Sequence, residues 1–248
     1  IVPVKVWLDR EAYFADGEMV KQVEHLAQLP FVFHHVVLTP DGHAGYGMPI
    51  GGVIATRGVI IPDAVGVDIG CGMLAVKTSL VEIDKDNLKS ILGLIRDRIP
   101  VGFDHHTNPV IPVTAMPEDI SDNPSTVNDY PIISREFKSA LHQVGTLGGG
   151  NHFIEIQKSS DGFIWFMVHS GSRNLGKKVC DYHNKIAKSL NTKWYSSVDP
   201  CWDLSFLPVD TDEGQCYLRE MNYCLQFAQL NRNIMAELIK QSFTDVLS

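Results

Sequence analysis

Residues 65–73 read Val-Gly-Val-Asp-Ile-Gly-Cys-Gly-Met, and the fold is interpreted outward from this stretch. Its glycines allow a tight turn and φ > 0. Apolar residues flank it at 58–61 and 74–76, so we predict a strand, a glycine loop and a second strand. Asp68 and Cys71 lie three residues apart on this loop, and both side chains bind metal ions once deprotonated. The alternative is a buried cysteine that packs as a small hydrophobe beside an aspartate bonded to loop amides.

Composition places the chain among ordinary globular proteins. Its 248 residues are the size of one large domain. Of these residues 44% are hydrophobic and 20% are charged, which is an ordinary globular composition. The net charge of −8 argues against binding nucleic acid over the whole surface. Residues 172–194, however, carry six basic side chains against one acidic side chain. Such a segment either binds phosphates locally or is a solvated helix face.

The lack of a recognisable targeting signal and the pattern of the cysteines favour a reducing compartment. No run is apolar enough to span a membrane, and no basic and apolar leader is present. The five cysteines are odd in number and form no CxxC pair, which favours free thiols and a cytoplasmic protein. The sequence starts at Ile1 and stops at Ser248 just past a helical pattern, so we expect a fragment or a processed chain.

Periodicity predicts a mixture of strands and helices. Asp84 is the expected N-cap of one helix, and Ser170 or Ser172 that of a basic helix starting near Arg173. Residues 39–52 hold five glycines and two prolines and are expected to form a functional loop. Strands are predicted at 4–8, 36–39, 152–157 and 163–168, helices at 18–29, 83–99, 134–144 and 213–240, and an irregular insertion with six prolines at 100–131.

Two more glycine-flanked polar sites accompany the first. Residues 145–155 read Gly-Thr-Leu-Gly-Gly-Gly-Asn-His-Phe-Ile-Glu, without the Gly-Lys-Ser/Thr of a Walker motif. On the strand that follows, Asn151 and Glu155 share one face and His152 lies on the other. His152 is either a metal ligand or a hydrogen-bonded core histidine. His169 follows the next predicted strand.

Four candidate ligands therefore lie at strand ends: Asp68, Cys71, His152 and His169. Carboxylate, thiolate and imidazole together are typical of a transition-metal centre, and the thiolate by itself would favour zinc. A single thiolate with two histidines and a carboxylate could also bridge two metal ions.

The motifs at 40–52, 65–73, 147–155 and 169–176 together resemble the RtcB family of RNA-splicing ligases, over nearly the whole chain. The resemblance implies one RtcB-like catalytic domain over 1–248, with an RtcB-like α/β (α+β) fold in which central β-sheets are flanked by helices. It also implies GTP- and manganese-dependent joining of RNA 3′-phosphate or 2′,3′-cyclic phosphate ends to 5′-hydroxyl ends, through a histidine-bound guanylate. The RNA would be tRNA halves or broken RNA ends.

Carried over by motif, Asp68, Cys71 and His152 would hold one manganese ion, and Cys71 would bridge to a second that His169 also binds. The guanylate-accepting histidine has no match here and is expected C-terminal to Ser248. Asp41-Gly-His43 matches a family pattern without an assigned role. The residues expected to contact the guanylate are Asn151, His152, Phe153, Ile154 and Glu155, and those expected to hold RNA phosphates are Arg173, Lys177 and Lys178.

Two other classes of function fit the same residues. A two-metal phosphoesterase would release phosphate from an RNA end without joining. A non-catalytic fragment would bind RNA and metal without GTP-dependent labelling.

Overall fold

A computed structural model describes residues 1–117 and 129–248 of the chain. The predicted α/β class is confirmed. The strands are β1 (Val4–Val6), β2 (Val32–His43), β3 (Ile50–Thr56), β4 (Val59–Ile60), β5 (Gly72–Lys77), β6 (Phe153–Lys158), β7 (Ile164–Ser170) and β8 (Leu207–Pro208). The helices are α1 (Arg10–Ala15), α2 (Gly17–Gln28), α3 (Pro62–Val65), α4 (Lys85–Arg98), η1 (Val113–Ala115), α6 (Ile133–Gln143), α7 (Arg173–Lys193), η2 (Pro200–Trp202) and α8 (Asp212–Leu247).

The described residues form two compact units, and each unit is discontinuous in sequence. The first contains Ile1–Val67 and Lys178–Arg219, and the second contains Asp68–Lys177 and Glu220–Ser248. Helices α7 and α8 each begin in one unit and end in the other. None of the helices in the described ranges combines the length and apolar character needed to cross a bilayer.

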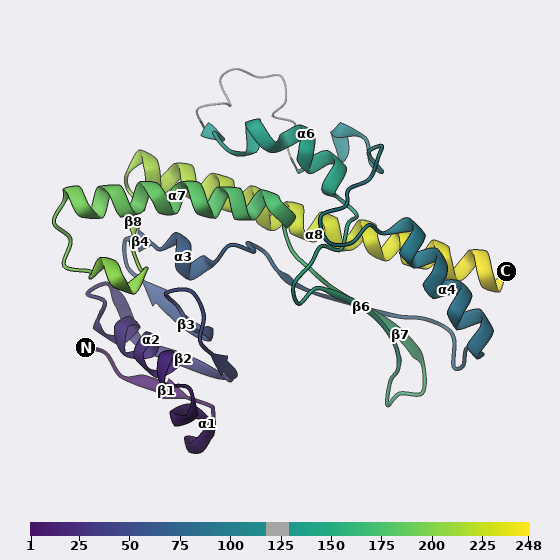
Figure 1. Cartoon of the computed structure of the whole chain (residues 1–248), viewed down its shortest axis with the longest axis horizontal. Coiled ribbons are helices and arrows are strands. Elements are labelled where there is room, and N and C mark those ends of the chain that lie inside the picture. The colour runs from purple at the N-terminus through teal and green to yellow at the C-terminus, as the bar shows by residue number, and fades with distance from the viewer. Residues whose placement is uncertain (118–128) are drawn as a thin grey trace. The chain divides into compact units, whose positions relative to one another are not determined.

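The first unit is built on a sheet of order β1-β2-β3 (Figure 1). β1 runs parallel to β2, and β3 pairs antiparallel to it. Asp16 caps α2 by accepting a 3.0 Å hydrogen bond from the Met19 amide. The apolar stripe of α2 then packs on the sheet, where Leu26, Val36 and Leu38 are fully buried.

The glycine-rich segment 39–52 differs from its prediction as one long loop. Its first residues extend β2 as far as His43 and its last three residues belong to β3, with His43 opposite Ile50. A register shift between Leu38 and His43 absorbs the irregular residues, as a β-bulge does. Strand pairing therefore overrides the turn composition. The short helix α3, between β4 and the loop of residues 66–71, was also missed.

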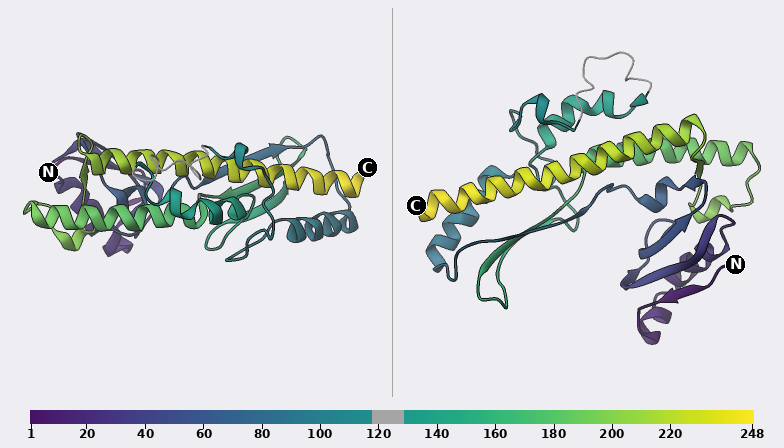
Figure 2. Two further views of the ribbon diagram at one scale, coloured as in Figure 1. Left: turned by 90° about the horizontal axis from the view of Figure 1, so that it is seen from above. Right: turned by 180° about the vertical axis from the view of Figure 1, so that it is seen from behind.

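The second unit holds the sheet β5-β7-β6, in which both strand pairs are antiparallel. One face is covered by α4 and the C-terminal half of α8, which lie side by side in all views (Figures 1 and 2). Arg98 of α4 donates a 3.0 Å hydrogen bond to Ser242 Oγ and pairs with Asp245, both on α8. The core residues are Ile91, Ile95 and Ile99 around α4, Ile164, Phe166 and Val168 of β7, and Met235, Ala236, Ile239 and Phe243 of α8.

Helix N-termini in this unit are capped partly by distant side chains. Asp84 accepts from the amides of Asp86 and Asn87, so the predicted cap of α4 is confirmed. Helix α6 is instead capped by Glu220, a buried residue of α8 whose Oε1 accepts from the Ile132 and Ile133 amides at 2.6 and 2.8 Å.

The predicted cap of α7 is wrong. Ser170 Oγ donates to the Leu147 carbonyl at 2.8 Å, and buried Ser172 Oγ has no hydrogen-bond partner among the described residues. The Asn174 amide at the start of α7 donates instead to Gln143 Oε1 at 3.2 Å. Of the expected irregular segment 100–131, residues 118–128 lie outside the described ranges.

Candidate metal centre

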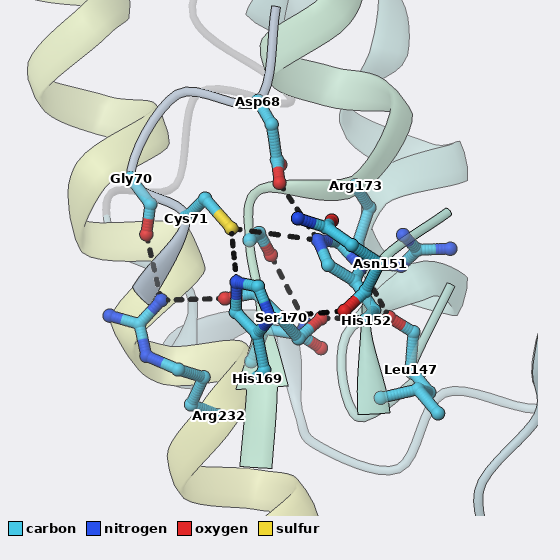
Figure 3. Close-up of polar contacts among 12 residues, drawn as sticks. Asp68, Gly70, Cys71, Leu147, Asn151, His152, His169, Ser170, Arg173 and Arg232 are labelled. Atoms are coloured by element: carbon cyan, nitrogen blue, oxygen red, sulfur yellow. Dashed lines mark hydrogen bonds and ion pairs between the residues drawn. The ribbon is translucent and has the colours of Figure 1, made fainter. Parts of the chain in front are cut away.

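The sheet of the second unit brings the four candidate ligands together at one end of its strands. Asp68 and Cys71 lie on the loop before β5, where the Cys71 amide donates to the Asp68 carbonyl at 3.0 Å. His152 directly precedes β6. His169 lies within β7 rather than after it, opposite Phe153 on one side and Met73 on the other. This register places the ends of three strands together (Figure 3).

The ligand atoms converge on one point. Asp68 Oδ2 lies 2.8 Å from His152 Nε2. Cys71 Sγ lies 3.1 Å from His169 Nε2 and 3.7 Å from His152 Nε2. The ligand atoms of Asp68, Cys71 and His152 all lie within 4.8 Å of one another. Separations of this size allow a single cation to contact all three side chains.

Both histidines are oriented by backbone carbonyls. His152 Nδ1 lies 2.9 Å from the Leu147 carbonyl, and His169 Nδ1 lies 3.1 Å from the Asn151 carbonyl. A carbonyl can only accept, so each Nδ1 is placed to donate its proton, and a metal ion would be bound through Nε2. Metal-binding histidines in proteins are commonly fixed through their second nitrogen in this way.

Electrostatics distinguish the two acidic ligands. Burial alone would raise the pKa of Asp68, but hydrogen bonds with His152 and Cys71 hold the net pKa below its ordinary value. Burial, the hydrogen bond with Asp68 and the charge of Asp68 raise the pKa of Cys71 to about 12. A bound cation reverses this effect because it stabilises the thiolate directly.

Two arginines border the cluster. Arg232 of α8 donates from Nη1 to the carbonyls of Gly70 and Ser170 at 2.7 and 2.9 Å, which ties the Cys71 loop to the end of β7 (Figure 3). Arg173 donates from Nε to Thr146 Oγ1 at 3.0 Å and from Nη2 to the Gly102 carbonyl at 3.2 Å. Burial lowers the pKa of each guanidinium, and both still remain charged at neutral pH.

Buried Asn231 on α8 supports the ligands from behind. Its Oδ1 accepts from the Gly145 amide at 2.7 Å and the Thr146 amide at 3.2 Å. Its Nδ2 lies 3.2 Å from Ser170 Oγ and donates to the Gly171 carbonyl at 3.2 Å. Since Ser170 also bonds to the carbonyl that orients His152, Asn231 belongs to the support of the metal ligands.

Sequence reasoning missed Asn231 and Arg232. A signal was available, because position 231 falls on the inward stripe of α8 defined by Phe227, Ala228 and Met235, all fully buried. A polar residue on a buried stripe needs hydrogen-bond partners.

Position 171 requires glycine because the Asp68 side chain lies directly against its backbone. A Cβ at this position would lie 2.0 Å from Asp68 Oδ1, so the carboxylate packs directly on the glycine backbone. The motif glycine after His169 and Ser170 therefore makes room for a candidate ligand.

Of the residues expected to contact a guanylate, Asn151 and His152 precede β6, and Phe153, Ile154 and Glu155 lie on it. Phe153 and Glu155 are exposed, and Ile154 packs against the core. The Phe153 ring lies 5.4 Å from the His169 ring in an edge contact. Among the residues expected to hold RNA, Lys177 and Lys178 are exposed on α7 and Arg173 is half-buried. Lys177 belongs to the second unit and Lys178 to the first.

Mixed α/β architecture and a cluster of carboxylate, thiol and imidazole groups define the class as an α/β protein with a candidate metal site. The sequence profile of the tRNA-splicing ligase RtcB family matches residues 22–248, and the chain belongs to the RtcB family. It is 34% identical over 250 residues to the RNA-splicing ligase RtcB of Escherichia coli K12, covering 95% of this chain and 59% of the relative. It is 33% identical over 260 residues to RNA-splicing ligase RtcB1 of another Escherichia coli strain, covering 99% and 62%.

A more distant relative matches over the same extent. The tRNA-splicing ligase RtcB of Thermococcus kodakarensis is 28% identical over 288 residues, covering 99% of this chain and 60% of the relative. The chain thus spans about three fifths of the length of these curated relatives.

Proposed function

We propose that this chain is the metal-binding part of a GTP- and manganese-dependent RNA ligase that joins RNA 3′-phosphate or 2′,3′-cyclic phosphate ends to 5′-hydroxyl ends. The observation that carries the proposal is the cluster of Asp68, Cys71, His152 and His169, with both Nε2 atoms near one thiol. Family membership and the names of the relatives support the reaction.

The donor set fits the expected ions. Asp68, Cys71 and His152 would hold one manganese ion, and Cys71 with His169 would hold a second. When bound, manganese supplies a Lewis acid for a phosphoryl oxygen. Carboxylate and imidazole suit manganese, whereas the thiolate also suits zinc, which binds more tightly in the Irving–Williams order. Zinc should therefore compete for the site.

Other residues of the chain would orient the metal ligands and bind the RNA and the guanylate. The carbonyls of Leu147 and Asn151 hold the two imidazoles in place. Arg173 uses Nε and Nη2 in hydrogen bonds to Thr146 and Gly102, and its guanidinium charge would attract an RNA phosphate, with Lys177 and Lys178 beyond it on α7. On β6 the exposed face with Asn151, Phe153 and Glu155 would receive the guanylate, together with the backbone of His152 and Ile154.

We also propose that the guanylate-accepting histidine lies outside residues 1–248. A metal-bound imidazole nitrogen has no lone pair to attack phosphorus, which removes His152 and His169. The other histidines of the chain lie in no segment that resembles the guanylate-accepting motif of the family. Incubating the chain with radiolabelled GTP and manganese should therefore leave no label on a denaturing gel. A labelled band would show that a histidine within the chain is the nucleophile.

Binding of RNA ends tests the function directly. With manganese, an RNA that ends in a 3′-phosphate should bind more tightly than the same RNA with a 3′-hydroxyl. Cys71→Ser should remove that preference, whereas Cys201→Ser, at an exposed free cysteine of the other unit, should keep it. Equal binding of both RNAs by the unsubstituted chain would refute the proposal.

A further inference from the structure

Phe103 is fully exposed, at 101% of its reference surface. It occupies a tight turn in which the Asp104 amide donates to the Val101 carbonyl at 3.2 Å and Gly102 has a φ of +65°. A phenylalanine ring gains its largest stabilisation from burial. Full exposure on an ordered turn is therefore unexplained by the fold of this unit.

The turn is attached to the metal centre by three contacts. The Gly102 amide donates to the Gly148 carbonyl at 2.8 Å, and Val101 forms a parallel bridge with Gly148. Arg173 donates to the Gly102 carbonyl at 3.2 Å. Gly148 directly follows Leu147, whose carbonyl orients His152. The position of Phe103 is thus set by the loop that sets a candidate ligand.

The charged residues beside the turn indicate where a phosphate could bind and where an aromatic contact is favoured. Arg173 is the cation bonded to the turn, and its charge interacts with that of Asp68 in the metal centre. Asp104, next to Phe103, would repel a phosphate. Burial together with the charge of Arg173 lowers the pKa of His105, so this second ring is neutral at pH 7. The segment therefore offers aromatic rings to a ligand whose phosphate reaches Arg173.

We propose that Phe103 is a stacking platform for one nucleobase within the last three nucleotides of the RNA 3′ end. The inference rests on the proposed function and adds a base-binding subsite to it. Single-stranded RNA is commonly held by stacking on exposed aromatic rings. One isolated ring suits one base, whereas a protein partner requires roughly 800 Å² on each side.

The experiment measures binding of short 3′-phosphate RNAs that carry 2-aminopurine at each of the last three positions, in manganese. Stacking on Phe103 should quench the fluorescence at one position. Phe103→Ala should remove that quenching and weaken binding about tenfold, as loss of one stacked base does, while Phe103→Tyr should retain both. Phe14→Ala is the matched control, since Phe14 is 64% exposed in the other unit. It should change neither quantity.

An RNA with an abasic nucleotide at the quenched position completes the test. The unsubstituted chain and Phe103→Ala should bind it equally. Equal binding of the intact RNAs by both proteins overturns the inference, and so does an equal loss for intact and abasic RNA. A change in sedimentation without a change in RNA binding would make Phe103 a protein contact and would also overturn it. A lack of preference of the unsubstituted chain for a 3′-phosphate would refute the proposed function. That result is read from the unsubstituted chain alone and is therefore distinct from the comparison between Phe103 and its variants.

Discussion

Replacing Asn231 by alanine should loosen the metal centre from a distance. Asn231 is fully buried on α8 and is bonded to the loop that starts at Gly145 and to the end of β7. The substitution removes the amide and keeps the helix, because alanine is the best helix former. The backbone groups left behind are the Gly145 amide and the carbonyls of Thr146 and Gly171, whereas the Thr146 amide keeps its 3.1 Å hydrogen bond to the Gln143 carbonyl.

The size of the effect follows from those three groups. A buried donor or acceptor without a partner costs about 1–3 kcal/mol. The space vacated by the amide can admit one water, which satisfies one or two of the three groups. We therefore expect the free energy of unfolding to fall by about 3 kcal/mol. For a chain of this length that corresponds to a midpoint lower by roughly 6–12 °C.

Two measurements check this expectation. Hydrogen exchange should accelerate at the Gly145 amide, because Asn231 Oδ1 is its acceptor at 2.7 Å. Manganese affinity should fall about 10- to 100-fold, as for other losses of support behind a metal ligand. Asn233→Ala is the matched control: Asn233 is exposed on the same helix, and surface substitutions change stability by about 0.5 kcal/mol or less.

Two outcomes would refute the reasoning. If the Gly145 amide exchanges at the same rate in Asn231→Ala and Asn233→Ala, its protection does not depend on Asn231. If Asn231→Ala loses stability but keeps its manganese affinity, Asn231 supports the fold and has no influence on His152.

Three further predictions concern the centre and its surroundings. Cys71→Ser should abolish tight manganese binding in calorimetry, since a hydroxyl is a poor substitute for a thiolate; unchanged affinity would exclude Cys71 as a ligand. The metal-free thiol has a pKa of about 12, so it must lose a proton on binding, and apparent affinity should rise tenfold per pH unit between about pH 7 and 9; an affinity independent of pH would contradict this. Replacing Lys177 and Lys178 by glutamine should weaken binding evenly across RNA sequences and flatten the logarithmic salt slope by about 1.4. An unchanged slope would make both lysines part of a solvated face.

Much of the second unit could be predicted from the sequence because the sequence signals of its strands and helices are local. Apolar runs indicated the strands that became β6 and β7, and Asp84 was recognisable as a cap from its position before an amphipathic helix. The proposed ligands could be named because each follows or precedes an apolar run, and the structure brings them together. Which strands pair, and in which register, is set by long-range packing that a single sequence does not reveal.

The remaining errors share one physical cause. Glu220 caps α6 from 88 residues away, and Asn231 reaches Gly145 across 86 residues. Local rules for capping favour a nearby serine, as with Ser172, but a buried carboxylate or amide on a neighbouring helix is an equally good acceptor. In 39–52, glycine and proline indicated a loop, and pairing between β2 and β3 prevailed.

The discontinuity of the second unit sets an order of events during protein synthesis. Arg232 closes the Cys71 loop onto Ser170 from 62 residues further along the chain. At a translation rate of about 5–20 residues per second, the ribosome needs roughly 3–12 s to make that intervening stretch. During this interval Asp68, Cys71, His152 and His169 already exist without the contacts of α8. The Cys71 thiol is therefore made before Arg232 can hold its loop in place, so in the proposed metal site the ions present at that moment would influence which one binds.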